Sequence, residues 1–238
     1  MLEALVGGET DSRRLAEMAQ GKLRNKRTEL GQALEGRVTT HHRFLLRELL
    51  DHLYFVESKM QKIEQEIEVR LGPFQSEVAR LCTIPGVDRV TAWGMVAEIG
   101  LNMSQFPDDQ HLASWAGLCP GSHLSAGKRK SGKIRKGSLW LRRCLCQAAW
   151  AVSTKKNNYL SALFRRLAAR RGVKRATIAV AHNILVIAYH ILRDGVCYWD
   201  LGPDYFDRLD PEGLRRRLTK RLEGLGFKVT LEPLAPVA

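Results

Sequence analysis

A tract of 84 residues, Gln110–Arg193, contains no aspartate or glutamate, although it carries 17 lysines and arginines. The net charge of the whole chain is +13, so the remaining 21 basic and 25 acidic residues sum to −4. So many like charges repel one another unless a polyanion lies close to them. The tract is therefore the candidate nucleic-acid-binding part of the chain, and a solvated basic surface without such a partner is the alternative.

The cations of this tract gather in clusters, and the first cluster is interspersed with glycine and serine. Residues 121–138 cannot hold a long helix, but their backbone amides and cations can approach phosphates closely. The sequence predicts a flexible, phosphate-facing loop over 121–138, followed by two arginines on the next helix. The candidate backbone-binding residues are Lys128, Arg129, Lys130, Lys133, Arg135, Lys136, Arg142 and Arg143.

The same tract limits the chemistry that the chain can perform there. A nuclease that works through Mg²⁺ needs two or more clustered carboxylates, which the tract lacks. Its candidate nucleophiles are hydroxyl groups, and cations around a phosphodiester would stabilise the charge that develops during attack. On chemistry alone each serine is more often a turn or cap residue, so the nucleophile stays open among Ser122, Ser125, Ser131 and Ser138.

Apolar residues spaced alternately by three and four predict a long helix from about residue 43 to 71 with a heptad seam. A second helix is expected from Asp11 or Ser12 to about Leu34, since Thr10-Asp11 can cap it. The two helices predict an antiparallel hairpin or an intermolecular coiled coil, hence a homo-oligomer through seam residues 46–67; packing of the seam on its own domain is equally compatible. The seam residues are Leu46, Leu49, Leu53, Val56, Met60, Ile63 and Ile67.

The segment 81–100 has the pattern of a helix-hairpin-helix. A helix that stops at Ile84, a tight turn at Pro85, Gly86 and Val87, and a new helix from about Arg89 would present backbone amides to a DNA phosphate. An ordinary connection between two helices is the alternative. Further helices are expected over 139–152, 159–171 and 175–193, and a basic helix over 215–222. The fold class is therefore mainly α, with divisions at 1–75, 76–210 and a basic tail, 211–238.

Several classes of protein are disfavoured by what the sequence lacks. The longest apolar segment, Ile178–Leu192, is interrupted by His182, Asn183 and His190, so no membrane span is expected. The N-terminus has no basic region followed by an apolar run, so secretion is not expected either. Five cysteines without paired spacing suggest neither a disulfide framework nor a zinc site, which fits a reducing cytoplasm.

Histidines and tryptophans are assigned structural roles. The histidines are spread over at least three expected helices, so they predict no metal site; they are His41, His42, His111, His182 and His190. The tryptophans lie mostly at helical apolar positions and are expected to anchor the core rather than stack on bases. They are Trp93, Trp115, Trp140, Trp150 and Trp199.

A series of short motifs follows a fixed order along the chain. They are Leu81–Val87, Ala97–Gly100, His111–Gly117, Pro120-Gly121, Ser125–Arg129, Ser131-Gly132, Lys136-Gly137, Leu141-Arg142 and Ala181-His182. Together they closely resemble the C-terminal transposase domain of the insertion-sequence-110 type transposases. The opening residues Leu2–Asp11, with Gly21–Arg24, Gly36-Arg37 and His41-His42, are similar to the coiled-coil segment before that domain. The resemblance covers essentially the whole chain.

The resemblance implies a serine transposase, or recombinase, that cuts and rejoins DNA through a covalent serine–DNA linkage. It also implies a structured non-coding bridge RNA that pairs with donor and target DNA, and a bacterial cytoplasmic, nucleoid-associated location. The family's nucleophile corresponds to Ser125, with Ser131 and Ser122 as the fallbacks. Lys128, Arg129 and Lys130 would then hold the scissile phosphate or the RNA backbone.

The resemblance also implies an N-terminal RNase-H-like domain whose Asp-Glu-Asp-Asp carboxylates bind Mg²⁺. We expect this chain to lack that domain, as a truncated product or with the missing half on another polypeptide. No cofactor is then expected within the chain itself, and Mg²⁺ is expected only with the other domain. A non-catalytic nucleic-acid-binding module or an inactive remnant of a mobile element is the alternative function.

Overall fold

The computed structural model describes residues 1–36, 38–120, 123–125, 128–131 and 134–232, and only the backbone of 123–125 and 128–131. The described chain is mainly helical, which confirms the predicted fold class. It forms two compact units, Met1–Pro73 and Phe74–Ala238, and each unit is described by itself.

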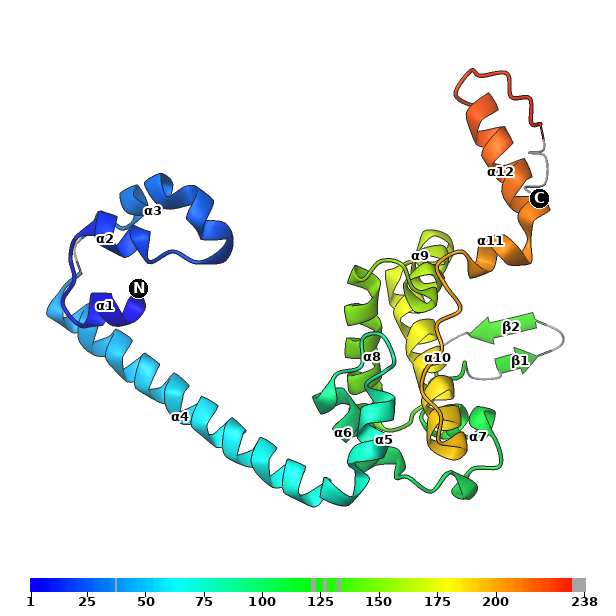
Figure 1. Cartoon of the computed structure of the whole chain (residues 1–238), viewed down its shortest axis with the longest axis horizontal. Coiled ribbons are helices and arrows are strands. Elements are labelled where there is room, and N and C mark those ends of the chain that lie inside the picture. Colours follow the sequence, from blue (N-terminus) through cyan, green and yellow to red (C-terminus); the bar gives the residue numbers. More distant parts are fainter. Residues whose placement is uncertain (37, 121–122, 126–127, 132–133, 233–238) are drawn as a thin grey trace, which may run out of the picture. The chain divides into compact units, whose positions relative to one another are not determined.

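The first unit begins with short helices. These are α1 (Leu2–Val6), α2 (Ser12–Glu17), the 3-10 helix η1 (Gly21–Lys26) and α3 (Arg27–Ala33) (Figure 1). The single helix predicted up to Leu34 is therefore wrong. Gln20 is extended and Gly21 has a φ of 58°, a left-handed conformation that interrupts the helix. The break lets α3 fold back on α2, where Leu15 and Ala16 are buried beside Gly31.

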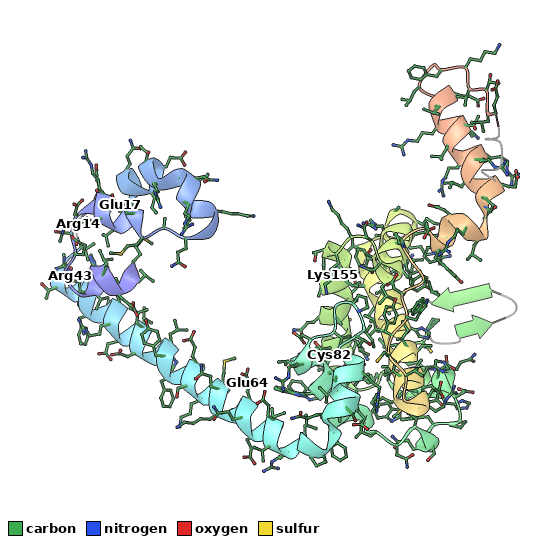
Figure 2. The ribbon with its side chains drawn as sticks, viewed as in Figure 1. Arg14, Glu17, Arg43, Glu64, Cys82 and Lys155 are labelled. Atoms are coloured by element: carbon green, nitrogen blue, oxygen red, sulfur yellow. The ribbon has the colours of Figure 1, made fainter. Side chains whose placement is uncertain are left out.

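The long helix α4 (Thr40–Arg70) confirms the prediction from the heptad spacing. It begins at Thr40 because Thr39 caps it: the Thr39 hydroxyl accepts from the His42 amide, and His42 Nδ1 accepts from the Thr39 amide, both at 3.3 Å. Helix α1 lies against it, and Arg43 Nε donates to the Leu5 carbonyl at 3.1 Å (Figure 2). None of the residues of α4 is buried in the unit.

The second unit is built around α10 (Val173–Asp194), which packs against α7, α8 and α9. Nine residues of α10 are buried. Within the described part of the chain, α10 is long and apolar enough to cross a membrane, but core helices pass the same test. The other elements are η2 (Gly72–Phe74), α5 (Gln75–Leu81), α6 (Arg89–Ile99), η3 (Met103–Gln105), α7 (Asp109–Trp115), β1 (His123–Ser125), β2 (Lys128–Ser131), α8 (Leu139–Thr154), α9 (Tyr159–Arg171), α11 (Tyr205–Leu209) and α12 (Pro211–Glu223).

Local sequence explains where the core helices begin and end. Helix α9 has the bounds that the sequence predicts, because the Asn158 side chain accepts from the Ser161 amide at 2.8 Å and caps it. Helix α10 ends at Gly195, which adopts a left-handed φ of 69°. The chain then crosses back over the core, where the Tyr198 amide donates to Thr83 Oγ1 at 2.9 Å and Asp200 accepts from the Tyr159 amide at 3.1 Å.

Candidate nucleic-acid interface

The basic segment after α7 forms an antiparallel pair of short strands, β1 and β2. The predicted loop over 121–138 therefore contains a β-hairpin, a correction that the glycine and serine content did not suggest. Ser125 pairs in register with Lys128, at the last pair before residues 126 and 127, and His123 pairs with Ser131. Thus the backbone brings Ser125 and the cationic strand, which carries Lys128, Arg129 and Lys130, onto one hairpin. Ser122 and Lys133 lie outside the described residues.

The base of this hairpin is held by two glycines whose backbones are in close contact. A Cβ atom on Gly137 would lie 2.3 Å from the Ala116 carbonyl oxygen, and one on Gly117 would lie 2.8 Å from the Arg135 carbonyl oxygen. Real Cβ atoms do not approach so closely, so only glycine fits this crossing at both positions. A bridge between Pro120 and Ile134 closes the ladder above it. The crossing and the bridge thus bring the two ends of the basic segment together at the end of α7.

A hydrogen-bond chain fixes the start of α8 beside the hairpin. The Ser138 hydroxyl accepts from the Leu141 amide at 3.1 Å, which makes Ser138 the N-cap that its position predicts. The same hydroxyl donates to Glu98 Oε2 on α6 at 2.6 Å. Ser138 is therefore occupied as a structural residue, which argues against it as a nucleophile. Glu98 ties the core helix α6 to the hairpin base.

Four of the predicted phosphate-binding residues have described side chains, and these side chains differ in their exposure to solvent. Arg135, Lys136 and Arg143 are exposed, so their charges are available to a ligand. Arg142 is half-buried and donates from Nη2 to the Arg135 carbonyl at 3.3 Å. Its Nε atom is buried and makes no hydrogen bond within the described residues. Arg142 therefore supports the hairpin base, whereas its three neighbours face solvent.

The turn predicted at Pro85, Gly86 and Val87 joins α5 to α6 and packs on α8. Gly86 has a φ of 90°, and a Cβ atom there would lie 2.5 Å from the Ala148 carbonyl oxygen. Asp88 caps α6 by accepting from the Thr91 amide at 2.8 Å, and hydrogen bonding from Thr91 lowers the pKa of Asp88. The turn thus has a clear packing role, and its contact with a DNA phosphate stays a prediction.

The tryptophans contradict the expectation that they anchor the core. Trp93 is buried, but the other four indoles are exposed. On α8 the buried residues are Leu141, Leu145, Ala148, Ala149 and Val152. Position 140 falls outside the stripe that these residues form, so the spacing itself could have identified Trp140 as exposed. Arg143 lies over the Trp140 ring, with its guanidinium carbon 5.3 Å from the ring centroid.

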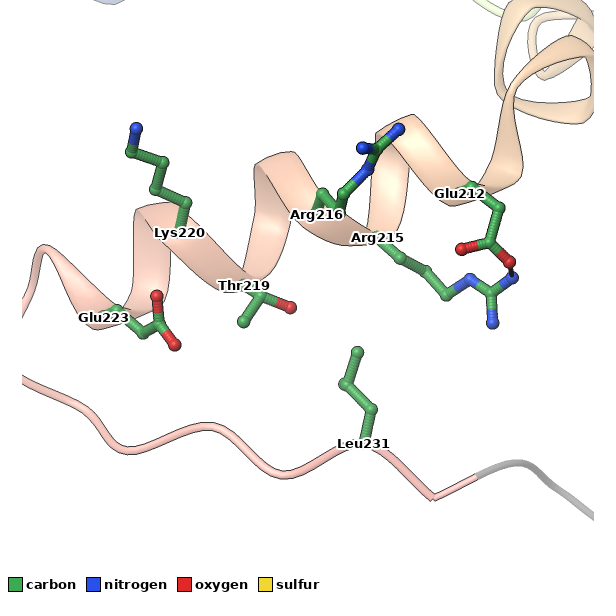
Figure 3. A pocket seen from close by; sticks show the side chains of 7 residues that line it. All are labelled: Glu212, Arg215, Arg216, Thr219, Lys220, Glu223 and Leu231. Atoms are coloured by element: carbon green, nitrogen blue, oxygen red, sulfur yellow. Dashed lines mark hydrogen bonds and ion pairs between the residues drawn. The ribbon is translucent and has the colours of Figure 1, made fainter.

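Elsewhere in the described part of the chain, the polar side chains form no metal site or disulfide. Within the described residues, no group of three His, Cys, Asp or Glu side chains is arranged to hold a metal. The five cysteines are free thiols, and burial raises the pKa of Cys82, Cys119, Cys144 and Cys146. A groove along α12 is lined by both cations and carboxylates, and its Arg215 pairs with Glu212 (Figure 3). Its lining residues are Glu212, Arg215, Arg216, Thr219, Lys220, Glu223 and Leu231.

The part of the chain that carries the hairpin is similar to known proteins. Residues 78–165 match the family model described as transposase, IS116/IS110/IS902 family. This range includes α6, the two-glycine crossing, the hairpin and α8. Part of the second unit is therefore similar to a transposase domain of this family.

Three curated relatives agree with this match. A probable family 20 transposase of Pseudomonas aeruginosa is 29% identical over 158 residues, which cover 65% of this chain and 46% of the relative. A putative transposase, y4pF/y4sB, of Sinorhizobium fredii is 28% identical over 157 residues, covering 64% and 38%. A pilin gene-inverting protein of Moraxella bovis is 32% identical over 116 residues, covering 48% and 36%. The chain thus spans less than half the length of these relatives.

Proposed function

We propose that this chain is part of a DNA transposase that cleaves and rejoins DNA strands, with the β1–β2 hairpin as its catalytic element. The observation that carries the proposal is a cationic hairpin, within residues 78–165, whose two ends meet at the crossing of Gly117 and Gly137. The hairpin lies in a sequence tract that has no carboxylates, so the positive electrostatic potential of this tract favours binding of a phosphate backbone.

Ser125 is the proposed nucleophile, with Ser131 and Ser122 as the fallbacks. Its Oγ atom would lose a proton and attack the scissile phosphorus. One phosphorus–oxygen bond to a deoxyribose would break, and the released oxygen would take up a proton. Lys128, which pairs with Ser125 in the hairpin register, together with Arg129 and Lys130, would stabilise the charge on the non-bridging oxygens. Lys133, Arg135, Lys136 and Arg143 extend the proposed backbone-binding surface, and Arg142 supports this surface from the hairpin base.

The residues around the hairpin do not fit a Mg²⁺ site. Glu98 contacts the hairpin base, but its oxygen accepts the Ser138 hydroxyl, and one carboxylate is fewer than such chemistry requires. Following the resemblance, Mg²⁺ would be held by an RNase-H-like domain.

The proposed partners are DNA, a structured non-coding bridge RNA and a second copy of the chain. The turn at Pro85–Val87 would contact DNA backbone as a helix-hairpin-helix. The exposed seam of α4 supports pairing between copies. The proposed location is the bacterial cytoplasm, at the nucleoid.

The test is a covalent-adduct assay with Ser125→Ala. The chain would be combined with an RNase-H-like partner domain, the flanking non-coding RNA and labelled duplex DNA, then run on a denaturing gel. The Ser125→Ala protein is expected to lose the adduct while binding DNA as before, because the hydroxyl forms the bond but the cations supply the affinity. Ser131→Ala and Ser122→Ala are the matched controls and should keep the adduct. An adduct that persists with Ser125→Ala would remove the assignment.

A second candidate function is a nucleic-acid-binding module without chemistry. The exposed side chains of Arg135, Lys136 and Arg143 favour it independently of any nucleophile. Under this function all three serine variants would bind alike and none would give an adduct. In either case affinity should fall by orders of magnitude between low and physiological salt, as ~6–10 phosphate contacts predict.

A further inference from the structure

The first turn of α8 exposes a large aromatic surface beside the hairpin base. Trp140 is 66% exposed, and its neighbour Leu139 is exposed as well. Leu141 and Leu145 on the inward face of the helix are fully buried, so the helix cannot turn to hide the indole without exposing them. A single exposed apolar side chain is common on protein surfaces, but Trp140 is exposed next to several cations.

Arg143 lies one helical turn after Trp140 and covers its ring. The guanidinium carbon is 5.3 Å from the ring centroid, within the range of a cation–π contact. Arg143 is itself exposed, and no carboxylate pairs with it in the described part of the chain. The indole is therefore held beside an arginine whose positive charge is not neutralised by a carboxylate and can bind an anionic ligand.

This pair has a defined position relative to the two-glycine crossing at the hairpin base. Trp140 follows Ser138, which is bonded to both Leu141 and Glu98, and Ser138 follows Gly137 of the two-glycine crossing. Two further exposed cations, Arg135 and Lys136, lie in the same short connection. An aromatic ring thus stands among cations at the point where the hairpin joins the core.

We propose that Trp140 and Arg143 form a stacking platform for an unpaired nucleotide next to the phosphate that the hairpin binds. A base in single-stranded or extruded form exposes its flat face to an indole, whereas a base inside a duplex does not. The neighbouring cations would hold the phosphates on either side of that base. The proposal rests on the proposed nucleic-acid binding, but it does not depend on which serine reacts.

The test compares single-stranded and duplex oligonucleotides by fluorescence anisotropy, using the full chain. Trp140→Leu is expected to weaken binding of a 12-nucleotide single strand by about 5- to 150-fold, the range for loss of one base stack. Duplex binding should change less than about twofold, because base faces are hidden there. Trp140→Phe keeps an aromatic ring and should restore most of the single-strand affinity. Trp199→Leu is the matched control, since Trp199 is 83% exposed outside α8 and should leave both affinities unchanged.

Separate arms with DNA and RNA single strands identify the source of the nucleotide, because a dependence on the 2′-hydroxyl would favour RNA. Equal losses on single strand and duplex would overturn the proposal, since they indicate a backbone contact. Unchanged affinities with altered self-association would also overturn it and would assign Trp140 to a protein interface. Ser125→Ala should retain the single-strand preference, so loss of the adduct and loss of stacking are distinguishable.

Discussion

The two longest helices, α4 and α10, both carry an apolar stripe, and they differ in what covers it. Nine residues of the 22-residue α10 are buried against α7, α8 and α9. None of the 31 residues of α4 is buried, although its seam includes leucine, isoleucine and methionine. Hydrophobic spacing thus predicts a helix and the face that seeks a partner, but not whether the same chain supplies that partner.

The difference has an energetic consequence. Burial of a leucine or isoleucine side chain contributes about 1.5–3 kcal/mol, so α10 stabilises the second unit strongly. Helix α4 has its Thr39 cap, its contacts with α1 and surface ion pairs such as Arg70 with Glu66, at 2.8 Å. Such surface pairs are worth less than about 1 kcal/mol. We therefore expect the seam of α4 to be covered by a second copy in solution.

The largest expected effect is on that association. The double variant Leu49→Glu and Ile63→Glu places charges on exposed seam positions two heptads apart. In a dimer four apolar side chains would leave the interface, so association should weaken more than about a thousandfold. Sedimentation equilibrium of the full chain measures this directly. The matched control is Leu209→Glu with Leu225→Glu, which are equally exposed outside α4 and should change nothing. A wild-type chain that sediments as a monomer at all concentrations contradicts the prediction.

A smaller but still large effect is expected in the core of the second unit. Ile184 on α10 is fully buried, so Ile184→Ala should lower the free energy of unfolding by about 2–5 kcal/mol. Leu209→Ala on α11 shortens a side chain that is 65% exposed in the same unit, and should cost under about 0.5 kcal/mol. Urea unfolding followed by tryptophan fluorescence separates the two, because all five tryptophans lie between Trp93 and Trp199. Equal losses for both variants would mean that the buried face of α10 is misassigned.

Local sequence rules predicted most of the helices in these two regions. The Asn158 and Ser138 caps and Gly195 mark the ends of α8, α9 and α10 because capping depends on neighbours within one turn. The same rules failed over residues 11–34, where the left-handed Gly21 divides an amphipathic segment into separate pieces. A glycine inside a periodic pattern is compatible with both outcomes, and packing of α3 on α2 decides between them.

The residue types of the candidate site could be predicted from the sequence, but the long-range contacts that hold it together could not. The count of charged residues located the cationic segment, and all of the motifs that resemble the transposase domain except Ala181-His182 lie in the range that the family model matches. The crossing of Gly117 and Gly137 joins residues twenty positions apart, and the Ser138–Glu98 hydrogen bond joins residues forty apart. No spacing rule relates such positions. The exposure of Trp140 was derivable, since the inward positions of α8 fix its outward face, but an apolar residue type in a helix does not by itself show that the side chain is buried.

The smallest expected effect concerns pH and a histidine on α10. Burial lowers the pKa of His182 below its ordinary value of 6.5, and the charge of Asp109 partly opposes that shift. The unfolded chain therefore binds a proton more readily than the folded one over this range. The contribution of His182 is complete above about pH 6.5 and is lost as pH falls toward the lowered pKa of the folded state.

Urea midpoints of the second unit, read by tryptophan fluorescence between pH 7 and pH 5, test this effect. The wild-type chain should lose stability on acidification, and His182→Gln should lose less over the same interval because it cannot take up the proton. His52→Gln on the exposed α4 is the control, since the tryptophan signal does not report on the first unit. If His182→Gln and the wild-type chain fall in parallel, the side chain is hydrated, and α10 is less well covered than its nine buried residues indicate.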